Sequence, residues 1–480
     1  MAGVSFPSTS PTETATAVWA DAVREVEPAL ALRIEGERDW RSAYLARVVD
    51  VTAAATRTPT GAVAVARSGL ASLRRRLQFS TDGAEMSVPA AVAELDGLPL
   101  RRHTVRGTGE RDRELIVPYR GQTLRGSQLL RQLDRWVNGQ IVERSFADAI
   151  AAVVEEPGWL DLQDSSFGLL GAGAELGPAL PLLQWGAQVA GVDLPAAAGW
   201  QRLVAAAEDS AGTLELPVQA DGRHGADLLL QTPEVARWLL EAAPDLPMAV
   251  GSYAYADGAK HVLVAVASDA VVDYVMRARP GTAYAELATS TDAYAVPYGV
   301  VEKARGRWDS RGWRAAAQSP VARASGGRLF APAYAVLLHR EDGAEVGIAD
   351  VLVPQQGPNY TLAKRLQRWR AVVAQADGAT VSANVAPATA TRSVTKNRLL
   401  AAAYAGASAF GVEVFRPETA RVLMAALLVH DVRAPRPGPT HPDDLFVEQS
   451  AHGGLWTLGY SARSVLGLAA ARGLPSTMRS

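Results

Sequence analysis

Tyr360 and Lys364 stand four residues apart in the segment GPNYTLAKRLQRW, a spacing that suits proton transfer. The apolar pattern predicts a helix over 359–375, and positions i and i+4 lie on one face of a helix. A free tyrosine is a poor acid or base at neutral pH because its pKa is about 10, but a neighbouring ammonium group lowers that pKa. The pair therefore predicts a tyrosine that transfers a proton. The alternative is an exposed tyrosine packed beside a lysine on a surface helix.

A glycine-rich turn, GAGAELG, follows a short apolar stretch and precedes a predicted helix. Gly171 permits a tight turn, Gly173 would let the backbone approach a pyrophosphate, and Gly177 would let the helix pack close to the strand. The N-terminus of that helix would offer unpaired amides to the phosphates. Ala174 and Glu175 fall within the same turn and complete the predicted cofactor cradle.

Asp193 ends the next predicted strand, about 20 residues after the turn, where dinucleotide-binding proteins place an acidic residue. A carboxylate there binds the ribose hydroxyls of NAD and repels the 2′-phosphate of NADP. No arginine or lysine follows Asp193 directly, so the sequence favours NAD over NADP. A turn without a ligand and an S-adenosylmethionine site are the alternatives for this segment.

The elements around these residues alternate between strand and helix from Ser166 onward, which is typical of a parallel sheet covered on both faces. We therefore expect an α/β fold with a doubly wound, parallel Rossmann-type sheet over 166–435. A mostly helical N-terminal domain is expected at 1–155, a pocket-forming insertion at about 257–346, and a C-terminal loop and helix at 436–480. Strands are predicted at 167–170, 188–193, 213–218, 247–251, 348–353, 380–385 and 411–415.

Over 167–415, roughly half of the chain, the sequence resembles the short-chain dehydrogenase/reductase superfamily. The resemblance rests on GAGAELG, Asp193, the stretch PMAVG, the pair Tyr360 and Lys364, and the stretch VSANVAPATAT. It implies that Tyr360 is the proton donor or acceptor. It also implies that Lys364 binds the nicotinamide ribose and lowers the pKa of Tyr360.

The same resemblance implies further contacts to the cofactor. Pro387, Thr389 and Thr391 would lie beside the nicotinamide carboxamide, after the strand that contains VSANV. Gly251 ends the predicted fourth strand and Ser252 follows it, and both would also contact the cofactor.

The sequence departs from the family pattern at positions that bear on the mechanism. The turn is G-x-G-x-x-x-G where the family has G-x-x-x-G-x-G, and VGSYAYADG stands in place of Asn-Asn-Ala-Gly. Gly347 occupies the place of the catalytic serine, so Gln355 or Gln356 becomes the candidate to polarise a substrate carbonyl. A lower-ranked hypothesis places the catalytic strand at Ser382 and Asn384, with Lys396 on the next helix.

We predict an NAD(P)-dependent oxidoreductase that transfers a hydride to or from a carbonyl or alcohol carbon of a small or bulky organic substrate. Two alternatives belong to other classes. The missing serine and asparagines are consistent with a dinucleotide-binding module that has lost catalysis, and the glycine turn with an acidic residue also suits an S-adenosylmethionine-dependent methyltransferase.

The composition argues against other classes of function. A net charge of −2 gives no basis for binding nucleic acid or an anionic membrane. The chain has no cysteine, and its seven histidines show no ligand spacing, so we expect no metal site. We expect no secretory signal and no membrane insertion, hence a cytoplasmic location, with a homo-oligomer left open. Only four of the 48 basic residues are lysines, namely Lys260, Lys303, Lys364 and Lys396.

Overall fold

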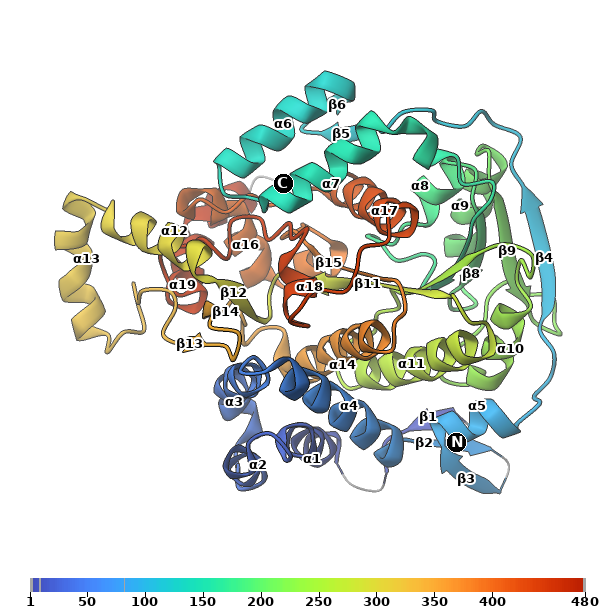
Figure 1. Cartoon of the computed structure of the whole chain (residues 1–480), viewed down its shortest axis with the longest axis horizontal. Coiled ribbons are helices and arrows are strands. Elements are labelled where there is room, and N and C mark those ends of the chain that lie inside the picture. Colours follow the sequence, from blue (N-terminus) through green and yellow to red (C-terminus); the bar gives the residue numbers. More distant parts are fainter. Residues whose placement is uncertain (1–2, 8–9, 82, 478–480) are drawn as a thin grey trace.

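The centre of the molecule is a seven-stranded, mostly parallel β-sheet in a mixed α/β fold (Figure 1). The computed structural model describes residues 3–7, 10–81 and 83–477. The parallel strands are short runs of valine, alanine and leucine, as expected for strands covered on both faces. The strands of this sheet are β4 (Arg101–Arg106), β7 (Ser166–Leu170), β8 (Gln188–Val192), β9 (Thr213–Val218), β10 (Met248–Ser252), β11 (Ala283–Thr289) and β15 (Val381–Ala386).

Across the sheet the strands lie in the order β15, β11, β10, β7, β8, β9, β4. From β7 the chain moves outward through β8 to β9, and it then returns to β10 and moves outward the other way to β11 and β15. The six strands from β15 to β9 are parallel to one another, and β4 pairs with β9 in the antiparallel direction. Because β4 comes from the segment 1–155, the expected N-terminal domain contributes a strand to the central sheet.

Helices cover both faces of this sheet (Figure 1). One face carries α10 (Thr232–Leu240), α11 (Lys260–Ala278) and α14 (Gly357–Ala376). The other face carries α8 (Ala179–Gln184), α9 (Ala197–Glu208) and α17 (Pro417–Arg433), and α7 (Arg144–Glu155) packs on α17. None of the helices in the described part of the chain has the length and apolarity needed to cross a bilayer.

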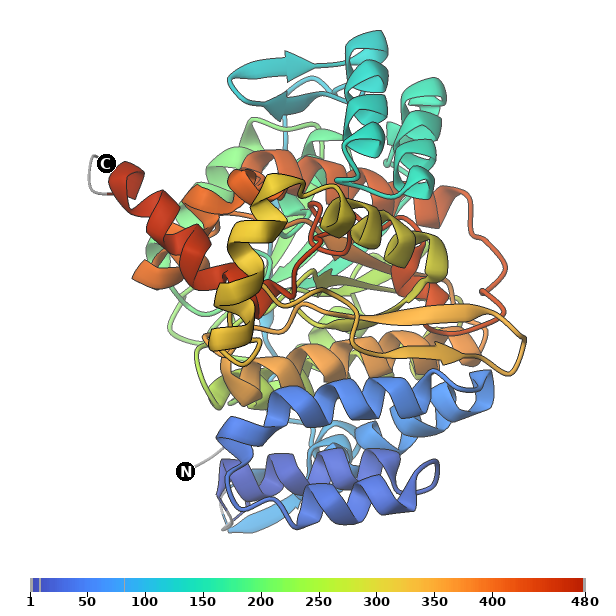
Figure 2. The ribbon, with the colours of Figure 1, turned by 90° about the vertical axis from the view of Figure 1, so that its left-hand side faces the viewer.

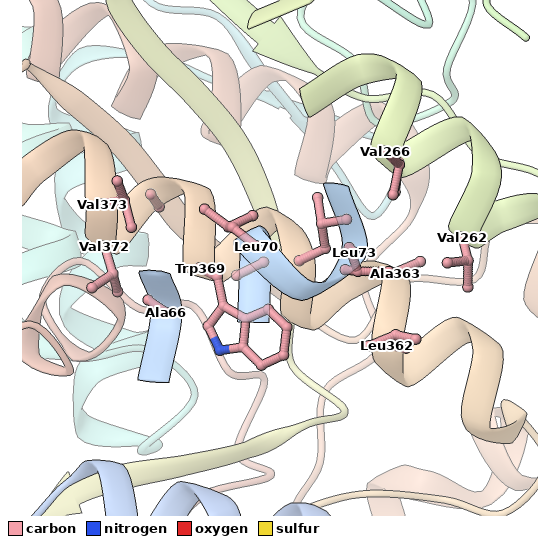
Figure 3. Packing of buried hydrophobic residues seen from close by; sticks show 14 of the residues in the cluster. Ala66, Leu70, Leu73, Val262, Val266, Leu362, Ala363, Trp369, Val372 and Val373 are labelled. Carbon is pink, nitrogen blue, oxygen red and sulfur yellow. The ribbon is translucent and has the colours of Figure 1, made fainter. Parts of the chain in front are cut away.

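The N-terminal helices form an outer layer against α14 (Figure 2). Trp369 of α14 is buried against α4, where a Cβ at Gly69 would lie 2.4 Å from the indole ring (Figure 3). The edge of Trp369 also meets Trp19 of α1, with ring centroids 5.5 Å apart. The layer consists of α1 (Pro11–Val23), α2 (Pro28–Glu35), α3 (Trp40–Ala55) and α4 (Pro59–Arg76).

The remaining elements lie outside the central sheet and the helices named above. Three smaller sheets are formed by β1 (Gly3–Ser5), β2 (Gln78–Thr81) and β3 (Ala84–Ser87), by β5 (Val117–Tyr119) and β6 (Gln122–Leu124), and by β12 (Ala293–Pro297), β13 (Leu337–His339) and β14 (Glu345–Asp350). The other helices are α5 (Val88–Glu94), α6 (Gly126–Asn138), η1 (Pro157–Leu160), α12 (Tyr298–Asp309), α13 (Trp313–Ala324), α15 (Arg392–Thr395), α16 (Arg398–Gly406), η2 (Ala407–Phe410), α18 (Asp444–Val447) and α19 (Ala462–Thr477).

Two predicted strands are wrong. The run at 348–353 was expected to join the parallel sheet, but β14 pairs antiparallel with β12 and β13 in a separate small sheet. The segment 411–415 forms no strand and contributes only a single bridge between Phe415 and Thr389. A short apolar run does not specify its partner, so the sequence could not distinguish these arrangements.

The first part of the segment expected to be an insertion belongs to the central sheet. α11 and β11 supply the crossover helix and the fifth parallel strand, and the additional segment begins after β11, with β12. α11 is rich in valine, a residue that favours strands, but it is buried between the sheet and α14, and this packing outweighs the local preference.

Candidate functional site

A cavity of about 490 Å³ lies at the carboxyl ends of β7, β8, β10, β11 and β15. It includes the place where the direction of winding reverses between β7 and β10, which is where open parallel sheets bind ligands. Gly251 does not line this cavity, and Gln355 lines only a neighbouring one. The predicted residues that do line it are Gly171, Gly173, Ala174, Glu175, Gly177, Asp193, Ser252, Gln356, Tyr360, Lys364, Pro387, Thr389 and Thr391.

The glycine turn is held in place by Asp193. Gly171 has a φ of +90°, and a Cβ there would lie 2.4 Å from the backbone nitrogen of Ala254, so only glycine fits. The backbone N–H of Gly173 donates to Oδ2 of Asp193 at 2.8 Å, and Oδ1 accepts from the N–H of Leu194 at 2.8 Å. Asp193 therefore shapes the turn from the end of the neighbouring strand.

Two expectations about this turn need correction. A Cβ at Gly177 would meet Ala174 within the turn, with the carbonyl oxygen at 3.2 Å, so Gly177 does not serve close packing of helix on strand. The helix that follows, α8, begins only at Ala179 and has six residues. Phosphate binding by a long helix N-terminus is therefore not available here.

Glu175 joins the turn to the opposite wall of the cavity. Its Oε2 accepts a hydrogen bond from the backbone N–H of Arg392 at 2.9 Å. Its backbone oxygen accepts from Nε of Arg421 at 2.9 Å. These bonds connect the segment after β7 with the segment after β15, which lie far apart in the sequence.

The side chain of Lys364 does not act on Tyr360 as the sequence predicts. Its Nζ donates to Oε1 of Gln367 at 2.8 Å and to the backbone oxygen of Leu287 at 3.2 Å, and it faces the buried carboxylate of Glu286. Burial raises the pKa of Tyr360, and the side chain of Thr289 only partly offsets this effect. The expectation that Lys364 lowers the pKa of Tyr360 is therefore wrong, because the ammonium group is hydrogen-bonded to Gln367 and to the Leu287 carbonyl on β11 instead.

Tyr360 belongs to an aromatic cluster at the wall of the cavity. Its ring centroid lies 5.5 Å from His261 and 6.4 Å from Tyr255. Burial, together with the charge of Lys364, lowers the pKa of His261 to about 3, so this imidazole is neutral. The ring of Tyr360 is thus fixed by packing, and its phenol stays protonated at neutral pH.

Other predicted residues have their polar groups already engaged. Oγ of Ser252 accepts from Nε2 of Gln367 at 3.2 Å, and Oγ1 of Thr389 donates to the backbone oxygen of Pro387 at 2.8 Å. Nε2 of Gln356 donates to Oγ1 of Thr291. In contrast, Oε1 of Gln355 is buried without a hydrogen-bond partner in the described chain.

The lower-ranked catalytic strand has a structural role. Oγ of Ser382 donates to Oδ2 of Asp431 at 2.7 Å, and Nδ2 of Asn384 donates to the same oxygen at 2.9 Å. Both side chains are buried and neither lines the cavity. Within the described ranges, no three histidine, aspartate or glutamate side chains are grouped so that they could hold a metal ion.

Three of the four lysines in the chain line this one cavity. Lys260 begins α11, Lys364 lies on α14, and Lys396 follows α15. Lys396 is exposed and lies 3.9 Å from the carboxylate of Asp257, whereas the fourth lysine, Lys303, faces Glu143. The scarcity of lysine was the signal that could have drawn attention to Lys260, which no motif in the sequence includes.

Glu286 predicts a pH dependence of stability. Burial raises its pKa to about 7, although the charge of Lys364 acts in the opposite direction. The native state then retains a proton that the unfolded chain releases above an ordinary pKa of about 4.5, so stability falls as the pH rises from there to about 7. We expect Glu286→Gln to gain stability relative to the wild type between pH 5 and pH 8. Urea unfolding across this range measures it.

The exposed Glu241→Gln is the matched control, and its unfolding midpoint should follow that of the wild type at every pH. Parallel curves for Glu286→Gln and the wild type would show that Glu286 is ionised in the native state throughout this range.

Comparison with known proteins adds no relative. No protein-family model matches the chain, and neither the curated proteins nor the solved structures contain a significant match. The function must therefore be inferred from the residues of the cavity.

Proposed function

We propose that the protein is an NAD(P)-dependent oxidoreductase built on a Rossmann-type sheet. The observation that carries the proposal is the single cavity where the glycine turn, Asp193 and Tyr360 meet. The strand order supports it, since β9, β8, β7, β10, β11 and β15 match the 3-2-1-4-5-6 order of dinucleotide-binding sheets.

The residues of the turn suit the adenosine half of the cofactor. At Gly171 the backbone conformation and the nearby Ala254 exclude a side chain, which keeps the turn tight against the segment after β10 at the edge of the cavity. A carboxylate has about four acceptor positions, so Asp193 can hold the Gly173 amide and still bind ribose hydroxyls. No cation neighbours Asp193 in the sequence, which favours NAD over NADP.

Tyr360 suits the proton step at the other end of the cavity. The nicotinamide, when bound, supplies or accepts the hydride. In the reducing direction the neutral phenol of Tyr360 donates a proton to the carbonyl oxygen, so that the hydride and the proton together give an alcohol. Gln355 lines the neighbouring cavity together with Tyr360, and its amide N–H group would be the donor that orients the substrate oxygen.

A second candidate function is a dinucleotide-binding module without catalysis. The inward orientation of Lys364 favours it, because the cation that would assist the tyrosine is bound to Gln367 and Leu287 instead. Both candidates require the cofactor to bind, and they differ in whether Tyr360 transfers a proton.

Titration of the protein fluorescence with NADH, NADPH and S-adenosylmethionine tests the proposal. We expect NADH to bind more tightly than NADPH, and S-adenosylmethionine not to bind. Asp193→Asn should weaken NADH binding by roughly tenfold or more, because hydrogen bonds to a charged group are lost. The same variant should show a smaller preference for NADH over NADPH. The exposed Asp209→Asn, at the end of α9, is the matched control and should bind as the wild type does.

Folded protein that binds neither nicotinamide nucleotide would refute the proposal. Binding of S-adenosylmethionine alone would support a methyltransferase instead.

A further inference from the structure

A second cavity, of about 510 Å³, adjoins the first at Tyr360. This volume falls within the roughly 300–1,000 Å³ of small-molecule sites. Most residues at the shared boundary are polar. The residues that line both cavities are Tyr255, Thr291, Gln356, Tyr360, Ala388, Ser393, Val394, Lys396 and Tyr404.

The second cavity becomes apolar away from this boundary. Its charged side chains, Asp257 and Lys396, lie 3.9 Å apart and offset one another. The walls come mainly from α16, η2 and α19, and the apolar residues that line this cavity alone include Leu400, Ala403, Ala407, Leu458, Val465 and Leu466.

Small residues fix the helices that form this wall. A Cβ at Gly406 of α16 would lie 2.0 Å from the backbone oxygen of Ala469, and one at Gly473 of α19 would lie 1.9 Å from that of Ala402. The two helices therefore pack backbone to backbone (Figure 1). Because the two helices are already in contact, they cannot approach one another any further to fill the cavity. An apolar ligand can therefore stabilise the site by burying its surface there.

We propose that this cavity binds the apolar body of the substrate, a ketone or secondary alcohol with an uncharged aliphatic or fused-ring body. The inference rests on the proposed oxidoreductase function, since Tyr360 at the shared boundary would then face the reacting carbon. The polar boundary holds the oxygen end, and the apolar walls of α16 and α19 hold the body.

The uncharged fluorescent probe N-phenyl-1-naphthylamine, displaced by 2-alkanols of increasing length, tests this assignment in the full-length protein. We expect the probe to bind, and each added methylene of the alcohol to raise its affinity by about fourfold until the cavity is full. Ala403→Leu and Ala407→Leu reduce the volume of the cavity. Each should lower the affinity for the probe and for the longer alcohols at least tenfold. Ala405→Leu, on the exposed face of α16, should leave both unchanged.

The NADH titration on the same variants separates this inference from the proposed function. Unchanged NADH binding with weakened probe binding in Ala403→Leu and Ala407→Leu supports both. Probe binding that these two folded variants retain in full, or a wild type that binds NADH but no probe, overturns the assignment of the apolar cavity. Cavity-dependent probe binding without any NADH binding would refute the oxidoreductase and the substrate role of the cavity with it.

Discussion

Replacement of Asp292 by alanine is expected to lower the free energy of unfolding by about 3–5 kcal/mol. Its carboxylate is 2% exposed and pairs with Nη2 of Arg365 at 2.8 Å and Nη1 of Arg368 at 2.7 Å. Both arginine side chains are almost fully buried on α14, so alanine would leave two buried cations without their counter-ion. Urea denaturation at pH 7 measures the loss.

The matched control is Asp377→Ala, which removes an exposed ion pair with Arg67 and should cost at most about 1 kcal/mol. Burial alone would raise the pKa of Asp292, but the charges of Arg365 and Arg368 outweigh this effect, and the net result is a pKa below the ordinary value. The stabilisation is therefore complete above the ordinary pKa and is lost as the pH falls through the lowered one. A difference between the wild type and Asp292→Ala that grows in acid would contradict this account.

Substitution of Tyr360 by phenylalanine is expected to lower kcat by about 10²–10⁴-fold, once a substrate is identified, while NADH binding changes little. The phenol lies at the boundary of the two cavities and burial keeps it protonated, and phenylalanine preserves the ring contacts with His261 and Tyr255. Steady-state kinetics together with the NADH titration separate catalysis from binding.

Tyr298→Phe, which removes a hydroxyl that accepts a hydrogen bond from Arg305 at a distance from both cavities, is the control and should keep full activity. Unchanged kcat in Tyr360→Phe would exclude Tyr360 as the acid. Loss of activity in Tyr404→Phe instead would assign the proton to another of the three tyrosines that line both cavities.

Local signals made the glycine-turn end of the cavity predictable from the sequence. The strands at 167–170, 188–193 and 213–218 lie within one or two residues of β7, β8 and β9, because apolar runs bounded by glycine and proline specify short buried strands. The glycine turn and Asp193 follow from those strands. Both signals lie within about 30 residues, so no distant part of the chain was needed to place them together.

The Tyr360 end of the cavity could not be predicted in the same way. The segment 283–289 contains three alanines and a glutamate, which is a weak strand pattern. The sequence therefore predicted neither β11 nor the position of the Glu286 carboxylate on it. Without β11, whose Leu287 carbonyl accepts a hydrogen bond from Lys364, the orientation of Lys364 could not be anticipated, since spacing on a helix fixes the face but not the partner. The apolar cavity depends on α19, which meets α16 only in the folded chain.

The antiparallel edge strand β4 has a consequence for how the chain folds. Arg101 pairs with Val218, so this edge of the sheet is complete only after more than a hundred further residues have been synthesised. Until then β4 exposes unsatisfied backbone groups, and contacts so distant in sequence slow folding because a long loop must close first. Separating the N-terminal segment at residue 155 would therefore remove a strand from the sheet that holds the cavity.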